Sequence, residues 1–136
     1  MNNFSLKSFF PFVEKYSSLE EVLNDNDLAA LGDAYINFIY SLALSKAAGK
    51  PVGRKLDSLT LSLALKKSDL RKFLPRRVDR HKQADAAEAL IVYGWLLGVI
   101  SIEEAVRILS HKGEIIENLS ELLRTILERS HLKHTS

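Results

Sequence analysis

The chain has no cysteine, and only three prolines and six glycines occur among its 136 residues. Without cysteine, neither a disulfide framework nor a thiolate zinc site can form. The longest uncharged apolar run, residues 89–100, contains two glycines and is shorter than the ~20 residues that a membrane-spanning helix needs. We therefore expect a cytoplasmic protein that makes no membrane contact. Its length and 46% hydrophobic content predict one domain over residues 1–136.

The hydrophobic pattern is that of helices. Apolar residues recur at three- and four-residue intervals, and no segment alternates as a strand does, so we predict an all-α helical bundle. Expected helices cover residues 6–16 with an interruption near Pro11, a short stretch after Ser17 or Ser18, and then 27–48, 57–67, 68–74, 81–97, 101–111 and 114–131. Asp27 is the expected cap of the long helix, and Ser101 with Glu104 forms a capping-box pattern.

Positive charge is concentrated in the middle of the chain. Residues 46 to 82 contain 12 Lys and Arg against 3 Asp, a net charge of +9, whereas the remainder of the chain carries −7. A concentrated basic stretch suits a polyanion such as nucleic acid. The alternative interpretation is a solvated, lysine-rich loop.

The helix over residues 28–44 carries an aspartate on a largely apolar surface. Its three strongly polar residues, Asp33, Asn37 and Ser41, fall within about 80° of one another at 100° per residue. The rest of its circumference is apolar, so we expect most of this helix to be buried, and one apolar stripe comprises Leu28, Leu31, Tyr35, Phe38 and Leu42. The aromatic residues assigned to packing are Tyr35, Tyr40, Tyr93 and Trp95. A buried aspartate costs several kcal/mol unless it is paired or coordinates a metal, so Asp33 predicts a salt bridge, an exposed edge or a metal site.

A second helix places two carboxylates on one face. Asp85 and Glu88 are three residues apart at the start of an apolar run, where they repel each other unless a cation lies between them. The alternative is that Arg80, Lys82 or a distant arginine neutralises them. If Asp33 joins them instead, the three acids form an oxygen-rich pocket of the kind that Mg²⁺ or Mn²⁺ prefers.

Two segments carry a resemblance to a known family. The sequence LAALGDA at residues 28–34 resembles the signature of the ribonuclease III family, and ADAAEALI at residues 84–91 resembles its second acidic motif. The resemblance extends over about residues 28–109 and implies a ribonuclease III-like endonuclease domain. It assigns catalysis and metal binding to Asp33, Asp85 and Glu88. The resemblance further implies a homodimer that cleaves double-stranded RNA and leaves 5′-phosphate ends. The helix over residues 28–44 would either lie in the dimer interface or serve only as part of the core.

The signature departs from the family pattern at Ala29 and Asn26, where the family carries glutamates. The short Mini-III branch also has a small residue at the first of these positions, so the chain resembles that branch or a divergent archaeal-type relative. We expect no double-stranded-RNA-binding domain, so that the domain must hold RNA by its own basic surface. The candidate phosphate contacts are Lys50, Arg54, Lys55, Arg76, Arg77, Arg80 and Lys82.

The departure at Ala29 and Asn26 motivates a second interpretation, a catalytically impaired RNA-binding or scaffolding protein of the same fold. A metal-dependent hydrolase of small nucleotides and a helical interaction module with salt-bridged acids are further alternatives.

Overall fold

The computed structural model describes residues 6–132, so both ends of the predicted domain lie outside the described residues. The described part contains helices and turns but no strand, which confirms the all-α prediction. The elements are α1 (Leu6–Phe9), the 3₁₀ helix η1 (Pro11–Lys15), α2 (Leu19–Leu23), α3 (Asn26–Ala48), α4 (Ser58–Lys67), the 3₁₀ helix η2 (Arg71–Phe73), α5 (Arg80–Leu97), α6 (Ile102–Leu109) and α7 (Ile115–Ser130).

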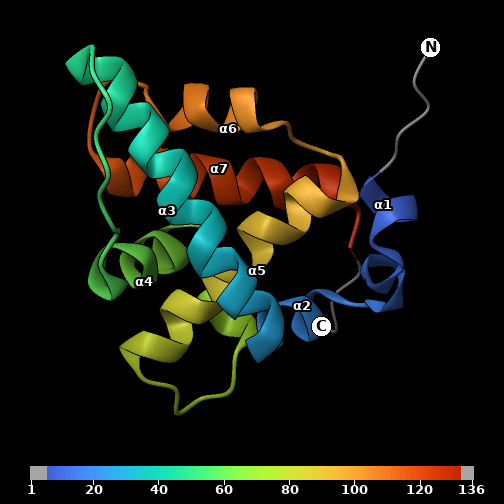
Figure 1. The fold of residues 1–136 in the computed structure, drawn as a ribbon. Coiled ribbons are helices and arrows are strands. Elements are labelled where there is room, and N and C mark those ends of the chain that lie inside the picture. The colour runs from blue at the N-terminus through green and yellow to red at the C-terminus, as the bar shows by residue number, and fades with distance from the viewer. Residues whose placement is uncertain (1–5, 133–136) are drawn as a thin grey trace.

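Helix α5 forms the centre of the bundle. Twelve of its 18 residues are buried, and α2, α3, α4 and α7 all pack against it (Figure 1). Its small residues let the neighbouring helices approach closely. A Cβ atom at Gly94 would lie 2.6 Å from a methyl carbon of Ile126 on α7, so a larger residue here would displace the Ile126 side chain.

Aspartate and serine side chains cap the N-termini of the main helices. The carboxylate oxygens of Asp57 and Asp79 accept the amides of Thr60 and Lys82, and the Ser101 hydroxyl accepts that of Glu104. The predicted cap of α3 was wrong. Asp25, not Asp27, accepts the amide of Leu28 at 3.0 Å, so the cap lies two residues before the predicted one and the helix begins at Asn26.

The helix predicted over residues 68–74 does not form. Asp69 adopts a left-handed backbone conformation with φ of 64°, and the amide of Leu70 donates to the carbonyl of Leu65, as in a Schellman motif. The Ser68 hydroxyl also donates to the carbonyls of Ala64 and Leu65. These bonds end α4, and only the single turn η2 remains of the predicted helix.

Part of the apolar stripe on α3 faces outward. Leu28 and Tyr35 are buried, but Leu31 is 44% and Phe38 54% exposed, so the expectation that most of this helix is buried was wrong. By length and composition alone α3 could cross a membrane, a test that the core helix of a soluble protein also passes. Because α3 packs along α5 and α6, we interpret it as a core helix with one uncovered apolar face.

The aromatic residues assigned to packing do pack. Tyr35 stacks on Trp95 with ring centroids 5.6 Å apart, and Tyr93 meets the edge of Tyr16. Tyr40 lies half-buried against the core. These contacts connect α3 and the residue that follows η1 to the central helix α5.

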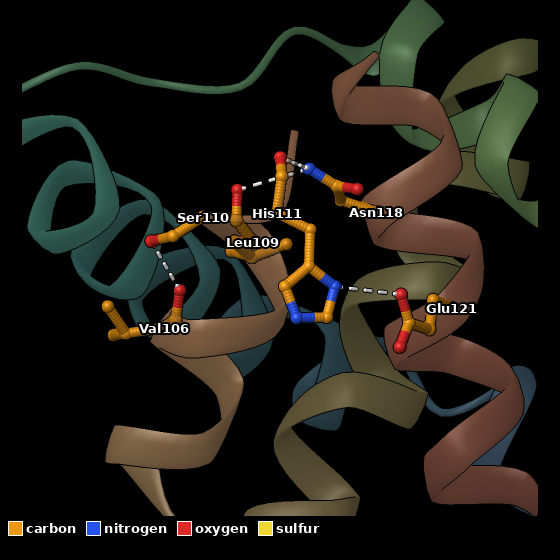
Figure 2. A network of polar contacts seen from close by, with 6 residues as sticks. All are labelled: Val106, Leu109, Ser110, His111, Asn118 and Glu121. Atoms are coloured by element: carbon orange, nitrogen blue, oxygen red, sulfur yellow. Dashed lines mark hydrogen bonds and ion pairs between the residues drawn. The ribbon is translucent and has the colours of Figure 1, made fainter. Parts of the chain in front are cut away.

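The turn between α6 and α7 is closed by a polar network (Figure 2). The buried Asn118 amide donates to the carbonyls of Leu109 and His111, at 3.3 and 2.8 Å. The Nδ1 atom of His111 lies 3.1 Å from a carboxylate oxygen of Glu121. Every polar group named here has a partner, as expected of a structural corner.

Candidate active site

The candidate site lies where the N-terminal halves of α3 and α5 cross. Gly32 faces the backbone of Glu88 so closely that a Cβ atom at position 32 would overlap the carbonyl of Glu88. Glycine is therefore required for contact between the two helix backbones. This contact explains why a glycine directly precedes Asp33, because it brings Asp33 next to the second acidic helix.

All three predicted acids line one pocket at this crossing. The pocket has a volume of about 390 Å³. Its lining residues are Asn26, Ala29, Ala30, Asp33, Leu56, Ser58, Leu61, His81, Ala84, Asp85 and Glu88. The two positions that depart from the family pattern, 26 and 29, thus also face the acids, and the buried Ala29 presents only a methyl group there.

Glu88 occupies the most buried position among the three acids, with 6% of its surface exposed. Burial, a hydrogen bond with Asp33 and the charges of Asp33 and Asp85 together raise the pKa of Glu88 to about 8. Each of these influences disfavours the charged carboxylate. Glu88 therefore holds a proton at neutral pH unless a cation enters the pocket.

Asp85 lies one turn before Glu88 and is half-buried. Burial raises its pKa, and the charges of Asp79 and Asp33 act in the same direction. Lys82 and His81 oppose the shift. The net direction is upward, so neighbouring basic groups compensate Asp85 only in part.

Asn37 fixes the position of Asp33. Its amide nitrogen lies 3.1 Å from the Asp33 carboxylate and 2.9 Å from the Asp33 carbonyl, and its oxygen accepts the amide of Leu56. One turn later, the Ser41 hydroxyl bonds the backbone of Arg54. The sequence predicted that Asn37 and Ser41 share a helix face with Asp33, but it did not indicate their hydrogen-bond partners. The structure adds that they hold the loop after α3 against the helix.

The donor chemistry of the pocket fits a hard divalent cation, although its carboxylates are not arranged as a ready ligand set. Within residues 6–132, no three carboxylate or imidazole side chains converge closely enough to hold an ion together. Two of the acids, Asp33 and Glu88, instead share a hydrogen bond. Carboxylate oxygens crowded together and only partly compensated by basic groups favour Mg²⁺ or Mn²⁺ over softer metals.

The predicted phosphate contacts lie on the two segments that lead into the pocket. Lys50, Arg54 and Lys55 precede the lining residues Leu56 and Ser58, whereas Arg76, Arg77 and Arg80 precede His81. These six side chains are exposed, and only Lys82 is half-buried. Their contact with RNA stays a prediction.

A ribonuclease III family model matches residues 26–130, which include both acidic segments and the whole pocket. The chain therefore belongs to the ribonuclease III family. Membership points to an endoribonuclease that processes RNA. A comparison with curated proteins found no match.

Proposed function

We propose that this protein is a divalent-metal-dependent endoribonuclease that cleaves double-stranded RNA and leaves 5′-phosphate ends, acting as a cytoplasmic homodimer. The observation that carries the proposal is the gathering of Asp33, Asp85 and Glu88 around one pocket, with a raised pKa at two of them. Structural acids are paired with basic groups, whereas acids held together at a raised pKa are typical of functional sites.

Asp33, Asp85 and Glu88 are the residues that would hold Mg²⁺ or Mn²⁺. A divalent ion in such a site activates water and stabilises charge on the phosphate that is cleaved. Asn37 orients the Asp33 carboxylate, and Gly32 keeps α3 against α5, so the chain sets the spacing between its acids. Glu88 must release its proton when a cation enters, which couples metal binding to pH.

The basic segments on either side of the pocket supply the surface for RNA. Lys50, Arg54 and Lys55 come from one segment, and Arg76, Arg77 and Arg80 from the other. Exposed basic side chains of this kind bind phosphates without reading base sequence, so we expect recognition of duplex shape.

The uncovered apolar face of α3 is the proposed contact between subunits. Leu31 and Phe38 are exposed there, and Phe38 borders a groove with Leu42 and Trp95. Replacement of Phe38 by Asp is expected to convert a dimer to a monomer in analytical ultracentrifugation. Replacement of Leu59 by Asp, at a residue on α4 that is 49% exposed, is the matched control and is expected to leave the dimer intact.

Cleavage of a purified RNA duplex tests the proposal. The wild-type protein is expected to cut in Mg²⁺ or Mn²⁺, to stop in EDTA, and to yield ends that accept no further 5′-phosphate. Asp33→Asn is expected to abolish cutting, whereas Asp69→Asn is the control, because Asn readily adopts the left-handed conformation of Asp69. Duplex binding without cutting, unchanged in Asp33→Asn, would instead support the RNA-binding scaffold that the methyl group of Ala29 favours.

A further inference from the structure

One basic residue next to the acidic pocket differs from the other six predicted phosphate contacts. The ammonium of Lys82 donates a hydrogen bond of 2.9 Å to the side-chain oxygen of Asn26. Lys82 lies in the first turn of α5 and Asn26 is the first residue of α3, so the bond joins the starts of the two acidic helices. Asn26 itself lines the pocket, and the bond therefore holds a positive charge beside the three acids.

The bond leaves Lys82 able to bind an anion. An ammonium group has three donors, and Asn26 accepts one of them. A lysine on an exposed loop must lose rotamer freedom when it contacts a phosphate, whereas Lys82 is already half-buried and tethered. Its ammonium also lies close enough to Asp85 to influence that carboxylate electrostatically.

We propose that Lys82, positioned by Asn26, holds a backbone phosphate of the bound RNA over the acidic pocket and so contributes to the cleavage rate as well as to affinity. This inference rests on the proposed function, since it names two residues that place the substrate at that site. Lys82 contacts the phosphate, and Asn26 acts only through Lys82. Asn26 thus positions Lys82 in this chain, at a position where the family pattern has a glutamate.

Three substitutions and a matched control test the proposal. Lys82→Met removes the charge, Lys82→Arg keeps it, and Asn26→Ala frees the lysine without removing it. Lys112→Met is the control, because Lys112 is exposed on the turn between α6 and α7, away from the pocket. Thermal unfolding verifies that each variant folds, and Lys82→Gln replaces Lys82→Met if the latter does not.

Two readouts separate positioning from a structural role. In EDTA, Lys82→Met is expected to reduce the slope of log affinity for duplex RNA against log salt concentration by about 1, as for the loss of one phosphate contact. With Mg²⁺ and saturating protein, its single-turnover cleavage rate is expected to fall about 100-fold, the scale of a misplaced substrate. Asn26→Ala is expected to keep the salt slope but to cut about 10-fold more slowly. Lys82→Arg, which keeps the charge, is expected to keep the salt slope, and Lys112→Met is expected to match wild type in both readouts.

The inference on Lys82 is overturned if Lys82→Met keeps the wild-type salt slope, or if Lys82→Met and Asn26→Ala both cut at the wild-type rate. In either case, cleavage by the wild-type protein still supports the proposed function. If wild type binds the duplex but does not cut it, the proposed function fails, and the salt slope alone decides whether Lys82 contacts a phosphate. If wild type does not bind the duplex, both are wrong.

Discussion

Carboxylates at the two ends of the molecule have opposite surroundings. At the α6–α7 end, the guanidinium of Arg129 donates two hydrogen bonds to Glu104, at 2.8 and 2.7 Å, and the pKa of Glu104 is lowered by this contact. Glu121 lies beside His111 (Figure 2). At the α3–α5 crossing, every influence on Glu88 raises its pKa.

This difference separates acids that stabilise the fold from acids whose charge is poorly compensated, and we propose that the second group is kept for a cation. A surface carboxylate paired with arginine contributes modestly to stability. A buried carboxylate next to two others costs stability, and a protein retains it where the chemistry needs it. The following predictions test whether the two groups of acids behave differently, from the largest expected effect to the smallest.

Neutralising one acid at each end should affect cleavage very differently. Glu88→Gln is expected to lower the rate of duplex RNA cleavage by about 1,000-fold, because loss of a metal ligand removes several kcal/mol of transition-state stabilisation. Glu104→Gln is the matched substitution and is expected to cut at the wild-type rate. Equal activities of the two variants, measured in single-turnover assays, would contradict the separation.

The same Glu88→Gln variant should be more stable than wild type in metal-free buffer. Between pH 4.5 and about 8 the folded protein keeps a proton on Glu88 that the unfolded chain has lost, so the free energy of unfolding falls as pH rises through this window. Removing the carboxylate is expected to gain about 3 kcal/mol at pH 7 and to flatten this pH dependence. Denaturant unfolding at several pH values measures the effect. Glu14→Gln, at an exposed residue, is the control, and a matching pH dependence in both variants would refute the assignment.

Gly32→Ala should separate the two acidic helices. Its Cβ would overlap the Glu88 carbonyl, so we expect a loss of about 2 kcal/mol in the free energy of unfolding, together with reduced cleavage. Gly53→Ala is the control, since no atom lies within 4 Å of a Cβ at that position. If Gly32→Ala proved as stable and active as Gly53→Ala, the close contact between α3 and α5 would not matter.

Breaking the pair at the opposite end should cost little. Glu104→Gln is expected to lower the free energy of unfolding by about 0.5–1 kcal/mol, and by less at high salt, because both side chains are partly exposed. Denaturant unfolding at two salt concentrations checks this. A gain in stability, as expected for Glu88→Gln, would mean that this end is strained by its acids as the pocket is.

The sequence was sufficient to predict the long helices and the acids that line the pocket. Apolar periodicity and capping residues located α3, α5, α6 and α7 to within a few residues, because local hydrogen bonds set helix ends. The pairing of Asp85 with Glu88 followed from their spacing. That Asp33 lies beside them came from the two motifs taken together.

The remaining features depend on contacts between distant residues. The bond from Lys82 to Asn26 spans 56 positions and that from Leu56 to Asn37 spans 19, so no local pattern contains them. Periodicity likewise identified the apolar stripe of α3 but not what covers it, and Leu31 and Phe38 proved exposed. The left-handed Asp69 ended α4 where helix propensity alone predicted further helix.

Binding of Mn²⁺, followed by electron paramagnetic resonance at neutral pH, tests the central claim most directly. We predict that wild type and Asp69→Asn bind the ion and release protons as Glu88 ionises, and that Asp33→Asn, Asp85→Asn and Glu88→Gln bind it far more weakly. Failure of wild type to bind Mn²⁺, or equal binding by all five proteins, would contradict the assignment of the α3–α5 pocket as a metal site.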